Sequence, residues 1–349
     1  MGQYYQKILT KKLSPILNSW GIDRLTKPFY SGKGQILILH RVIPSSGKER
    51  INNHLSLEIS PEQLDSIIAF FRRKDYDFIS LDMLPTWLEN NHKTSRKFVI
   101  FTFDDGYKDN LDFAYPVFKK HNIPFTIYIT NSFPDRRAII WWYILEDLIL
   151  RNSRIKYSFS VGSVNRNCPT YRKKERTFIY IRELIIRLHN KNLEEELTGF
   201  FSKFGFSILD HNSDLVLSWN EISELSKDPL VTIGAHTLNH YNLCNLTDKQ
   251  SFHEILESKK ILESKINYKV NHFSYPFGKY GIRDIEFVKK SNYLTATTTE
   301  NANTFYNHID HQFTLPRISI NALSTEKVLN LQVNGFYPAI LHKFKRIVY

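Results

Sequence analysis

The sequence predicts an α/β fold, a (β/α) barrel that carries a helical insertion. Apolar runs rich in β-branched and aromatic residues recur along the chain, separated by segments with helical spacing, a rhythm typical of parallel strands joined by helices. Acidic and histidine side chains directly follow several of these runs, and β/α barrels place their chemistry at the carboxyl ends of strands. The chain has 349 residues, 42% of them hydrophobic, which is enough for one large core or two modest ones.

The strands are expected, in chain order, at 36–39, 78–81, 98–103, 124–130, 230–235, 272–275 and 294–298, with a further strand-like segment at 315–320. The helices are expected at 61–73, 83–90, 109–121, 222–226, 251–266, 282–291 and 325–334. The first helix follows Ser60, a good N-terminal capping residue.

Residues 135–217 break the rhythm with a long, basic stretch that we interpret as a helix-rich insertion. Helical periodicity is clear at 182–188 and 193–204. The aromatic residues at 141–143 either pack the insertion on the barrel or overhang a groove. The insertion is a structural flap, or a lid that grips substrate through the basic cluster formed by Arg172, Lys173, Lys174 and Arg176.

Two adjacent carboxylates, Asp104 and Asp105, follow the apolar run 98–103 and precede Gly106. Neighbouring carboxylates repel each other, so a fold keeps such a pair when a cation binds one and the other serves as a base. The alternative is an acidic turn that binds nothing.

Two histidines, His236 and His240, follow the apolar run 230–235. Their spacing of four predicts that both imidazoles lie on one face of a helical turn and reach one ion. With Asp105 they would form a set of two nitrogens and one oxygen that suits zinc or a similar divalent metal acting as a Lewis acid.

These motifs resemble those of the polysaccharide deacetylases, the carbohydrate esterases of the NodB-homology class, over most of residues 35–320. Residues 101–107 resemble the Thr-Phe-Asp-Asp-Gly motif of that family, and residues 236–240 its His-Ser/Thr-x-x-His motif. Residues 273–278 resemble its aromatic-Pro-aromatic-Gly segment, in the form found in the branch that acts on surface and biofilm polysaccharides.

The resemblance implies a distorted, incomplete barrel at 35–322. It implies that Asp104 is the catalytic base and that Asp105, His236 and His240 are the metal ligands. Zn²⁺ is the expected ion, with Co²⁺, Ni²⁺, Mn²⁺ and Fe²⁺ as alternatives. A substrate groove is expected to be lined by Tyr107, Tyr275, Pro276 and Phe277.

Two departures from the family pattern affect the remaining roles. Ser274 stands where many members carry the arginine that holds the base, and we expect Arg317 to replace that arginine. The late histidine that supplies the general acid is poorly matched by His342, so we assign the acid to His40, at the end of the first strand. The alternative for His40 is a structural histidine that only forms hydrogen bonds.

The expected function is metal-dependent hydrolysis of N-acetyl groups on amino sugars of a surface polysaccharide or its precursor. One alternative is a catalytically degenerate module that only binds glycans. Another is a deformylase or O-acetyl esterase that acts on a lipid-linked sugar.

The formal net charge of +12 is unevenly distributed. Residues 1–50 contain nine Lys and Arg against two acidic residues, and residues 151–191 contain eleven against two. Such surfaces suit an anionic polysaccharide, a lipid-linked sugar or acidic phospholipids, although a solvated basic face is the commonest outcome. No recognisable nucleic-acid-binding module occurs, so nucleic acid is not an expected partner.

The segments outside the barrel are a basic amphipathic helical segment at 1–34 and a helix with a basic tail at 323–349. They either pack on the domain or associate with a membrane surface. Neither a secretory signal nor a run of eighteen apolar residues is present, and we therefore expect a location in the cytoplasm or at the cytoplasmic membrane surface. Cys168 and Cys244 lack redox or metal spacing and are expected to be free thiols.

Overall fold

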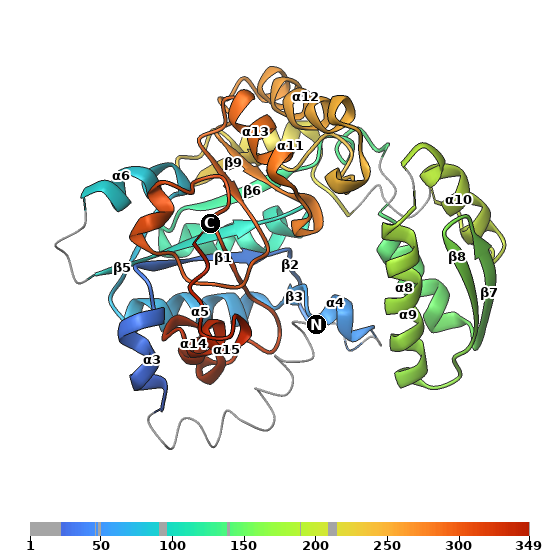
Figure 1. Cartoon of the computed structure of the whole chain (residues 1–349), viewed down its shortest axis with the longest axis horizontal. Coiled ribbons are helices and arrows are strands. Elements are labelled where there is room, and N and C mark those ends of the chain that lie inside the picture. The colour runs from blue at the N-terminus through green and yellow to red at the C-terminus, as the bar shows by residue number, and fades with distance from the viewer. Residues whose placement is uncertain are drawn as a thin grey trace.

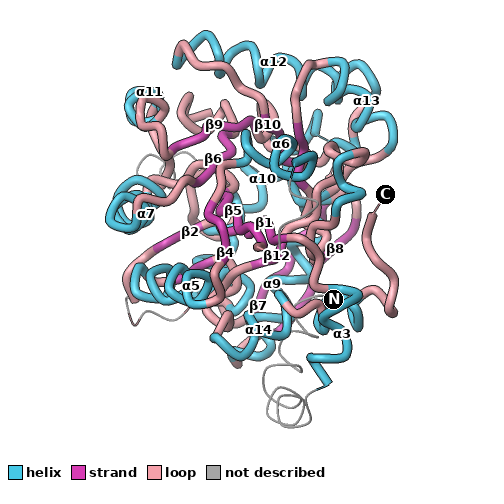
Figure 2. The backbone as a smooth tube through the Cα atoms, turned by 90° about the vertical axis from the view of Figure 1, so that its left-hand side faces the viewer, coloured by secondary structure: helices cyan, strands magenta, loops and turns pink. Residues whose placement is uncertain are grey.

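The computed structural model describes residues 22–45, 47, 50–90, 96–137, 140–188, 190–208 and 215–348. A curled parallel sheet surrounded by helices forms the main body, and the helix-rich insertion lies to one side of it (Figures 1 and 2). None of the helices in these ranges combines the length and the apolar character that a membrane span requires.

Within the described residues the central sheet has eight strands in the order β11-β10-β9-β6-β5-β1-β12, with β4 paired to the start of β5. Every pairing between them is parallel. Both faces of the longer strands are buried, as expected for a parallel sheet covered by helices. The bounds are β1 Gly34–Leu39, β4 Tyr76–Phe78, β5 Lys97–Phe103, β6 Phe125–Ile129, β9 Val231–Ala235, β10 His272–Ser274, β11 Thr295–Thr297 and β12 Ile318–Ser319.

One short segment, residues 315–319, contacts both edges of this sheet. Leu315 forms a parallel bridge with Thr297 of β11, whereas Ile318 in β12 pairs with Leu37 of β1. The segment therefore curls the sheet into an incomplete barrel, and Arg317 lies between the two contacts. The predicted α/β class and incomplete barrel are confirmed.

The helices around the barrel are α3 Ile22–Tyr30, α4 Asn52–Leu55, α5 Pro61–Arg73, α6 Leu84–Asn90, α7 Tyr115–His121, α11 Trp219–Leu225, α12 Asp248–Ile266, α13 Ile282–Lys290, α14 Glu326–Val333 and α15 Phe336–Leu341. Helix α5 begins where the sequence predicts, because Ser60 and Gln63 form a reciprocal capping box with bonds of 3.2 and 3.0 Å. A short pair, β2 Arg41–Val42 with β3 Glu58–Ile59, lies near the carboxyl end of β1.

Two predicted elements have different bounds in the structure. The strand expected at 78–81 is β4, which ends at Phe78, and a 3₁₀ turn at Leu81–Met83 leads into α6. The helix expected from 109 starts with a π turn at Asn110–Ala114. Pro116, in the first turn of α7, has no N–H to continue a regular hydrogen-bond ladder with the preceding turn.

The insertion consists of α8 Trp141–Arg151, β7 Arg154–Phe159, β8 Gly162–Asn167, α9 Tyr171–Ile186 and α10 Asn190–Ser202. Its helices surround a hydrophobic cluster of their own, which includes Ile144, Phe178 and Phe200. The antiparallel β7–β8 hairpin was not predicted, because only a few apolar residues alternate with polar ones along it. Cys168 and Cys244 are both free, as expected.

The predicted amphipathic helix of the first twenty residues lies outside the described residues. Helix α3, the described part of segment 1–34, contacts α15 from the C-terminal segment. The Tyr30 hydroxyl donates to the Phe344 carbonyl oxygen at 2.7 Å, and Arg346 Nε donates to the Phe29 carbonyl oxygen at 2.8 Å. The segments flanking the barrel therefore pack against each other.

Candidate active site

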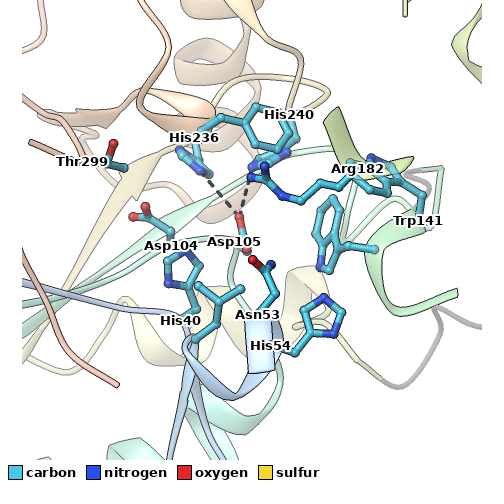
Figure 3. Close-up of a pocket in the computed structure, with 13 residues that line it drawn as sticks. His40, Asn53, His54, Asp104, Asp105, Trp141, Arg182, His236, His240 and Thr299 are labelled. Carbon is cyan, nitrogen blue, oxygen red and sulfur yellow. Dashed lines mark ion pairs between the residues drawn. The ribbon is translucent and has the colours of Figure 1, made fainter. Parts of the chain in front are cut away.

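Polar side chains from several strand ends gather around one cavity of about 200 Å³ at the carboxyl edge of the sheet (Figure 3). His40 follows β1, Asp104 and Asp105 follow β5, and His236 follows β9. The other described residues that line the cavity are Asn53, His54, Leu57, Trp141, Trp142, Arg182, His240, Phe277 and Thr299.

Asp105, His236 and His240 form a compact cluster of potential metal ligands. Asp105 Oδ1 lies 3.6 Å from His236 Nε2 and 3.3 Å from His240 Nε2. One ligand atom from each residue lies within 4.8 Å of the other two. Two ligands at about 2.1 Å from a tetrahedral zinc ion are about 3.4 Å apart, so this donor set fits a divalent ion.

The protonation of His236 also suits a metal ligand. Its Nδ1 atom lies 2.7 Å from the carbonyl oxygen of Ser274, which can only accept a hydrogen bond, so Nδ1 carries the proton and Nε2 is left for an ion. Burial lowers the pKa of His236 to about 4 against the opposing charge of Asp104. The ring is therefore neutral at ordinary pH, as metal binding requires.

The predicted helical turn that joins the two histidines is wrong. Thr237 and His240 have positive φ angles of 66° and 57°, which a right-handed helix excludes. The loop is instead held by side chains. The Thr237 hydroxyl accepts from the His240 N–H at 3.0 Å, and Glu254 of α12 accepts from the backbone and side-chain amides of Asn239 at 2.8 and 2.7 Å.

The turn after β5 separates the two adjacent carboxylates. Asp105 and Gly106 have φ angles of 76° and 73°, and a non-glycine residue adopts such an angle only where its surroundings hold it. Figure 3 shows Asp105 directed at the histidines and Asp104 on its own side of the cavity. Burial raises the pKa of Asp105, but the hydrogen bond and charge of His240 outweigh it, and the net pKa lies below the ordinary value.

Asp104 forms a buried, two-pronged ion pair with Arg317. Arg317 Nη1 and Nη2 each lie 2.7 Å from one oxygen of Asp104, and Arg317 Nε donates to the Thr298 carbonyl oxygen at 2.8 Å. The Ser274 hydroxyl accepts from Arg317 Nη2 at 2.9 Å. The contact expected between Arg317 and Asp104 is therefore present. Burial raises the pKa of Asp104, but the opposite effect of nearby charges, that of Arg317 foremost, outweighs it, and the net pKa lies below the ordinary value.

The two candidate acid histidines have different surroundings. His40 lines the cavity beside Asp104, and its backbone carbonyl oxygen accepts from Asn110 Nδ2 at 2.9 Å (Figure 3). His342, by contrast, lies after α15, where its Nε2 atom is 3.0 Å from the Asn301 carbonyl oxygen. This placement favours His40 over His342 as the group that meets a substrate.

Of the residues expected to line the groove, Phe277 lines the cavity, and its ring centre lies 4.6 Å from that of His240. The side chains of Tyr107, Tyr275 and Pro276 are buried and are not among the described lining residues. Tyr107 accepts a hydrogen bond from Trp142 Nε1 at 3.0 Å, which ties the strand end to the insertion. Of the four residues expected in the groove, Phe277 is therefore the one among the described lining residues of this cavity, and a groove role for the other three stays a prediction.

The insertion supplies part of the wall, but not through the predicted basic cluster. None of Arg172, Lys173, Lys174 and Arg176 is among the described lining residues. Lys174 donates to carbonyl oxygens at the end of α8, including that of Ile149 at 2.6 Å. Arg182 lines the cavity instead. It was not singled out from the sequence, and neither were Asn53, His54 and Thr299, because no local motif marks them.

A family model described as polysaccharide deacetylase matches residues 91–296, more than half of the chain. The chain belongs to the polysaccharide deacetylase family. YxkH of Bacillus subtilis (strain 168), which is assigned to the polysaccharide deacetylases, is 23% identical over 265 residues, covering 76% of this chain and 64% of YxkH. The match thus spans less than two thirds of that relative.

Several solved structures share the fold of this chain. The Streptococcus pyogenes deacetylase PplD, in complex with acetate, has a TM-score of 0.56 at 17% identity, with 86% of this chain and 97% of PplD covered. IcaB from Ammonifex degensii has a TM-score of 0.54 at 16% identity, with 87% of this chain and 97% of IcaB covered. At these identities the similarity shows a shared fold and nothing beyond it.

Proposed function

We propose that this member of the polysaccharide deacetylase family is a metal-dependent hydrolase that removes N-acetyl groups from amino sugars of a surface polysaccharide or its precursor. The observation that carries the proposal is the convergence of Asp105 with two imidazole nitrogens beside a second, separately held carboxylate, Asp104. The acetate in the PplD structure is the product expected from such a reaction, and it supports the same chemistry here.

A divalent ion held by Asp105, His236 and His240 would polarise the acetamide carbonyl and lower the pKa of a bound water. Zn²⁺ is our first choice, with Co²⁺, Ni²⁺, Mn²⁺ and Fe²⁺ as alternatives, because imidazole and carboxylate donors suit all of them.

We assign to Asp104 the role of accepting the proton of the attacking water. A general base must be ionised, and the pairing with Arg317 keeps this carboxylate ionised despite its burial. The amine that departs from the sugar needs a proton. We assign the role of proton donor to His40, which lines the same cavity as Asp104.

The cavity limits the substrate. At about 200 Å³ it is smaller than the roughly 300–1,000 Å³ typical of drug-sized ligands, and Trp141 and Trp142 of the insertion close one side. We infer that one acetylated sugar enters the cavity while the rest of the glycan remains outside.

A glycan-binding module and a deformylase or O-acetyl esterase are the competing functions. A pure binding protein has no need of the Asp104–Arg317 pair, which brings an ionised carboxylate into the cavity at the cost of burying charge. The pair therefore favours an enzyme over a binding module. The N-deacetylase, deformylase and O-acetyl esterase alternatives differ in the substrate that they cleave.

The test measures amine release from acetylated glucosamine oligomers and from lipid-linked acetylated sugars, together with formate release and ester cleavage on matched substrates. Asp104→Asn keeps the side-chain volume and should abolish turnover, whereas Asp112→Asn, a change in the same connection outside the cavity lining, should not. A chelator should stop the reaction and added zinc should restore it. Chelator-resistant activity would contradict the metal mechanism, and binding without turnover would favour the glycan-binding module.

We also propose peripheral attachment to an anionic membrane surface through the face where α3 meets the C-terminal segment. Phe29 and Phe344 are 59% and 60% exposed there. Lys27, Lys33 and Arg346 line the adjacent depression of about 470 Å³, so apolar and cationic groups occur together. Co-sedimentation with vesicles containing anionic lipid should fall for Phe29→Ser but not for Ile282→Ser, an exposed apolar residue on α13. Equal losses would remove this proposal.

A further inference from the structure

A fourth histidine of the described cavity lining, outside the family motifs, lies where the barrel meets the insertion. His54 of α4 lines the cavity and is 1% exposed (Figure 3). Its Nδ1 atom lies 2.7 Å from Glu146 Oε2, and because an ionised carboxylate only accepts, Nδ1 carries a proton. The other ring nitrogen, Nε2, is buried and has no hydrogen-bond partner among the described residues.

Glu146, on α8 of the insertion, is held independently of His54. Arg50 Nε lies 3.1 Å from both of its oxygens, and the Ile51 N–H donates to it at 2.6 Å. Arg50 is itself paired with Glu58 at 2.7 Å. Burial raises the pKa of Glu146, but the hydrogen bonds and charges of His54 and Arg50 lower it below the ordinary value. The carboxylate is therefore ionised and fixed.

The imidazole of His54 is also fixed in orientation. Its ring centre lies 4.7 Å from that of Tyr143 and 5.0 Å from that of Phe178. Glu146 is held by Arg50, by the Ile51 N–H and by the Nδ1 atom of His54. The Nε2 atom of His54 takes no part in these contacts. A buried polar atom without a partner is costly, and a histidine oriented by a carboxylate is a recurrent way to prepare the second nitrogen for a ligand.

Arg182 brings a cation to the same cavity. It comes from α9, and Figure 3 shows it entering on the insertion side, which it shares with Trp141. Its ion pair with the neighbouring Glu183, at 2.8 Å, involves a carboxylate that is 59% exposed. Arg182 itself is half-buried, but a pair with so exposed a carboxylate contributes little, and a ligand can replace it. A hydrogen bond from His54 Nε2 to an anion needs a proton on both ring nitrogens, and the Glu146 carboxylate, 2.7 Å from Nδ1, balances the charge of that form. His54 and Arg182 line the same cavity.

We propose that His54, oriented by Glu146, and Arg182 form an anion subsite that binds a phosphate or carboxylate carried by the saccharide, next to the sugar whose acetamide is hydrolysed. This inference rests on the proposed deacetylase function and narrows its substrate class. The substrate is an acidic glycan or a glycosyl phosphate, not a neutral chitin-like oligomer. His54 acts as a binding residue, and Glu146 as the positioning residue behind it.

The experiment measures binding to the full-length Asp104→Asn protein by calorimetry, so that no turnover interferes. The ligands are N-acetylglucosamine 1-phosphate, a muramic-acid-containing oligosaccharide that carries a carboxylate, and a neutral N-acetylglucosamine oligomer. His54→Gln and Arg182→Gln should each weaken binding of the charged ligands roughly tenfold or more and leave the neutral ligand within about twofold. Arg172→Gln, on the exposed face of the same helix α9, is the matched control and should change nothing.

The two charged ligands distinguish the source of the anion, since the preferred one identifies it as phosphate or carboxylate. Equal losses for charged and neutral ligands, with a lowered melting temperature, would show a structural role and overturn the proposal. Preference of the parent protein for the neutral oligomer would overturn it as well. If His54→Gln does not fold, Arg182→Gln carries the test. Selective anion binding by a protein that never releases amine would remove the deacetylase function but keep the subsite.

Discussion

Replacing Arg317 by methionine should destabilise the protein more than any surface ion-pair change, because it leaves Asp104 as a buried carboxylate without a counter-charge. Both side chains are essentially buried, and two bonds of 2.7 Å join them. Removing one partner of a buried pair costs about 3–5 kcal/mol. Whole-protein stabilities are about 5–15 kcal/mol, so the loss is a large fraction of the total.

The assay is reversible urea unfolding, followed by circular dichroism, of the parent protein, Arg317→Met, Asp104→Asn and the double variant. In the Asp104→Asn background, Arg317→Met leaves no unpaired charge behind, because the carboxylate is already gone. Arg317→Met should therefore cost at least about 1–2 kcal/mol less there than in the parent protein. Arg73→Met is the matched control. Its pair with Glu326 is also short, at 2.9 Å, but the two side chains are 57% and 62% exposed. That change should cost about 1 kcal/mol or less.

A cost for Arg317→Met no greater than that for Arg73→Met, or strict additivity in the double variant, would refute the reasoning. Arg317→Lys separates charge from geometry. Lysine keeps the positive charge but cannot form two parallel bonds to a carboxylate. We expect Arg317→Lys to recover part of the stability while amine release stays well below that of the parent protein.

The remaining predictions concern pH, the cavity wall and the metal. Burial raises the pKa of Asp228, but its hydrogen bond with Lys119 brings it down to about 2. Above pH 4 the free energy of unfolding in urea should therefore be about 1 kcal/mol higher for the parent protein than for Asp228→Asn, and this difference should disappear as the pH falls towards 2. Gly278→Ala should cost about 1–2 kcal/mol, because φ is 63° and the new Cβ would lie 1.8 Å from the Thr299 hydroxyl oxygen; unchanged melting would contradict this. His240→Ala should lower zinc stoichiometry in metal analysis, and full zinc loading would contradict the ligand set.

Local patterns in the sequence determined much of the barrel. The apolar run of β5 and the carboxylates after it could be placed at a strand end without coordinates, because strand periodicity and turn residues are local properties. The N-terminus of α5 was predicted for the same reason, since Ser60 caps it through residues only three positions away. The order of strand-end motifs was enough to indicate one reaction centre.

Tertiary structure decided which side chains meet there and in what orientation. Arg317 reaches Asp104 because residues 315–319 bridge the two edges of the sheet, a pairing between segments more than 200 residues apart that no local pattern encodes. The positive φ angles at Thr237 and His240 replace the expected helical turn, and they depend on contacts with α12.

The cavity wall that contains His54 and Arg182 was also decided by tertiary structure and not by local sequence. His54 and Arg182 carry no motif, and each has an ordinary sequence context. Their place in the cavity depends on how the insertion packs against the barrel, through Glu146 on one side and α9 on the other. Periodicity and motifs report on neighbours along the chain, whereas a binding surface is assembled from side chains that only folding brings together.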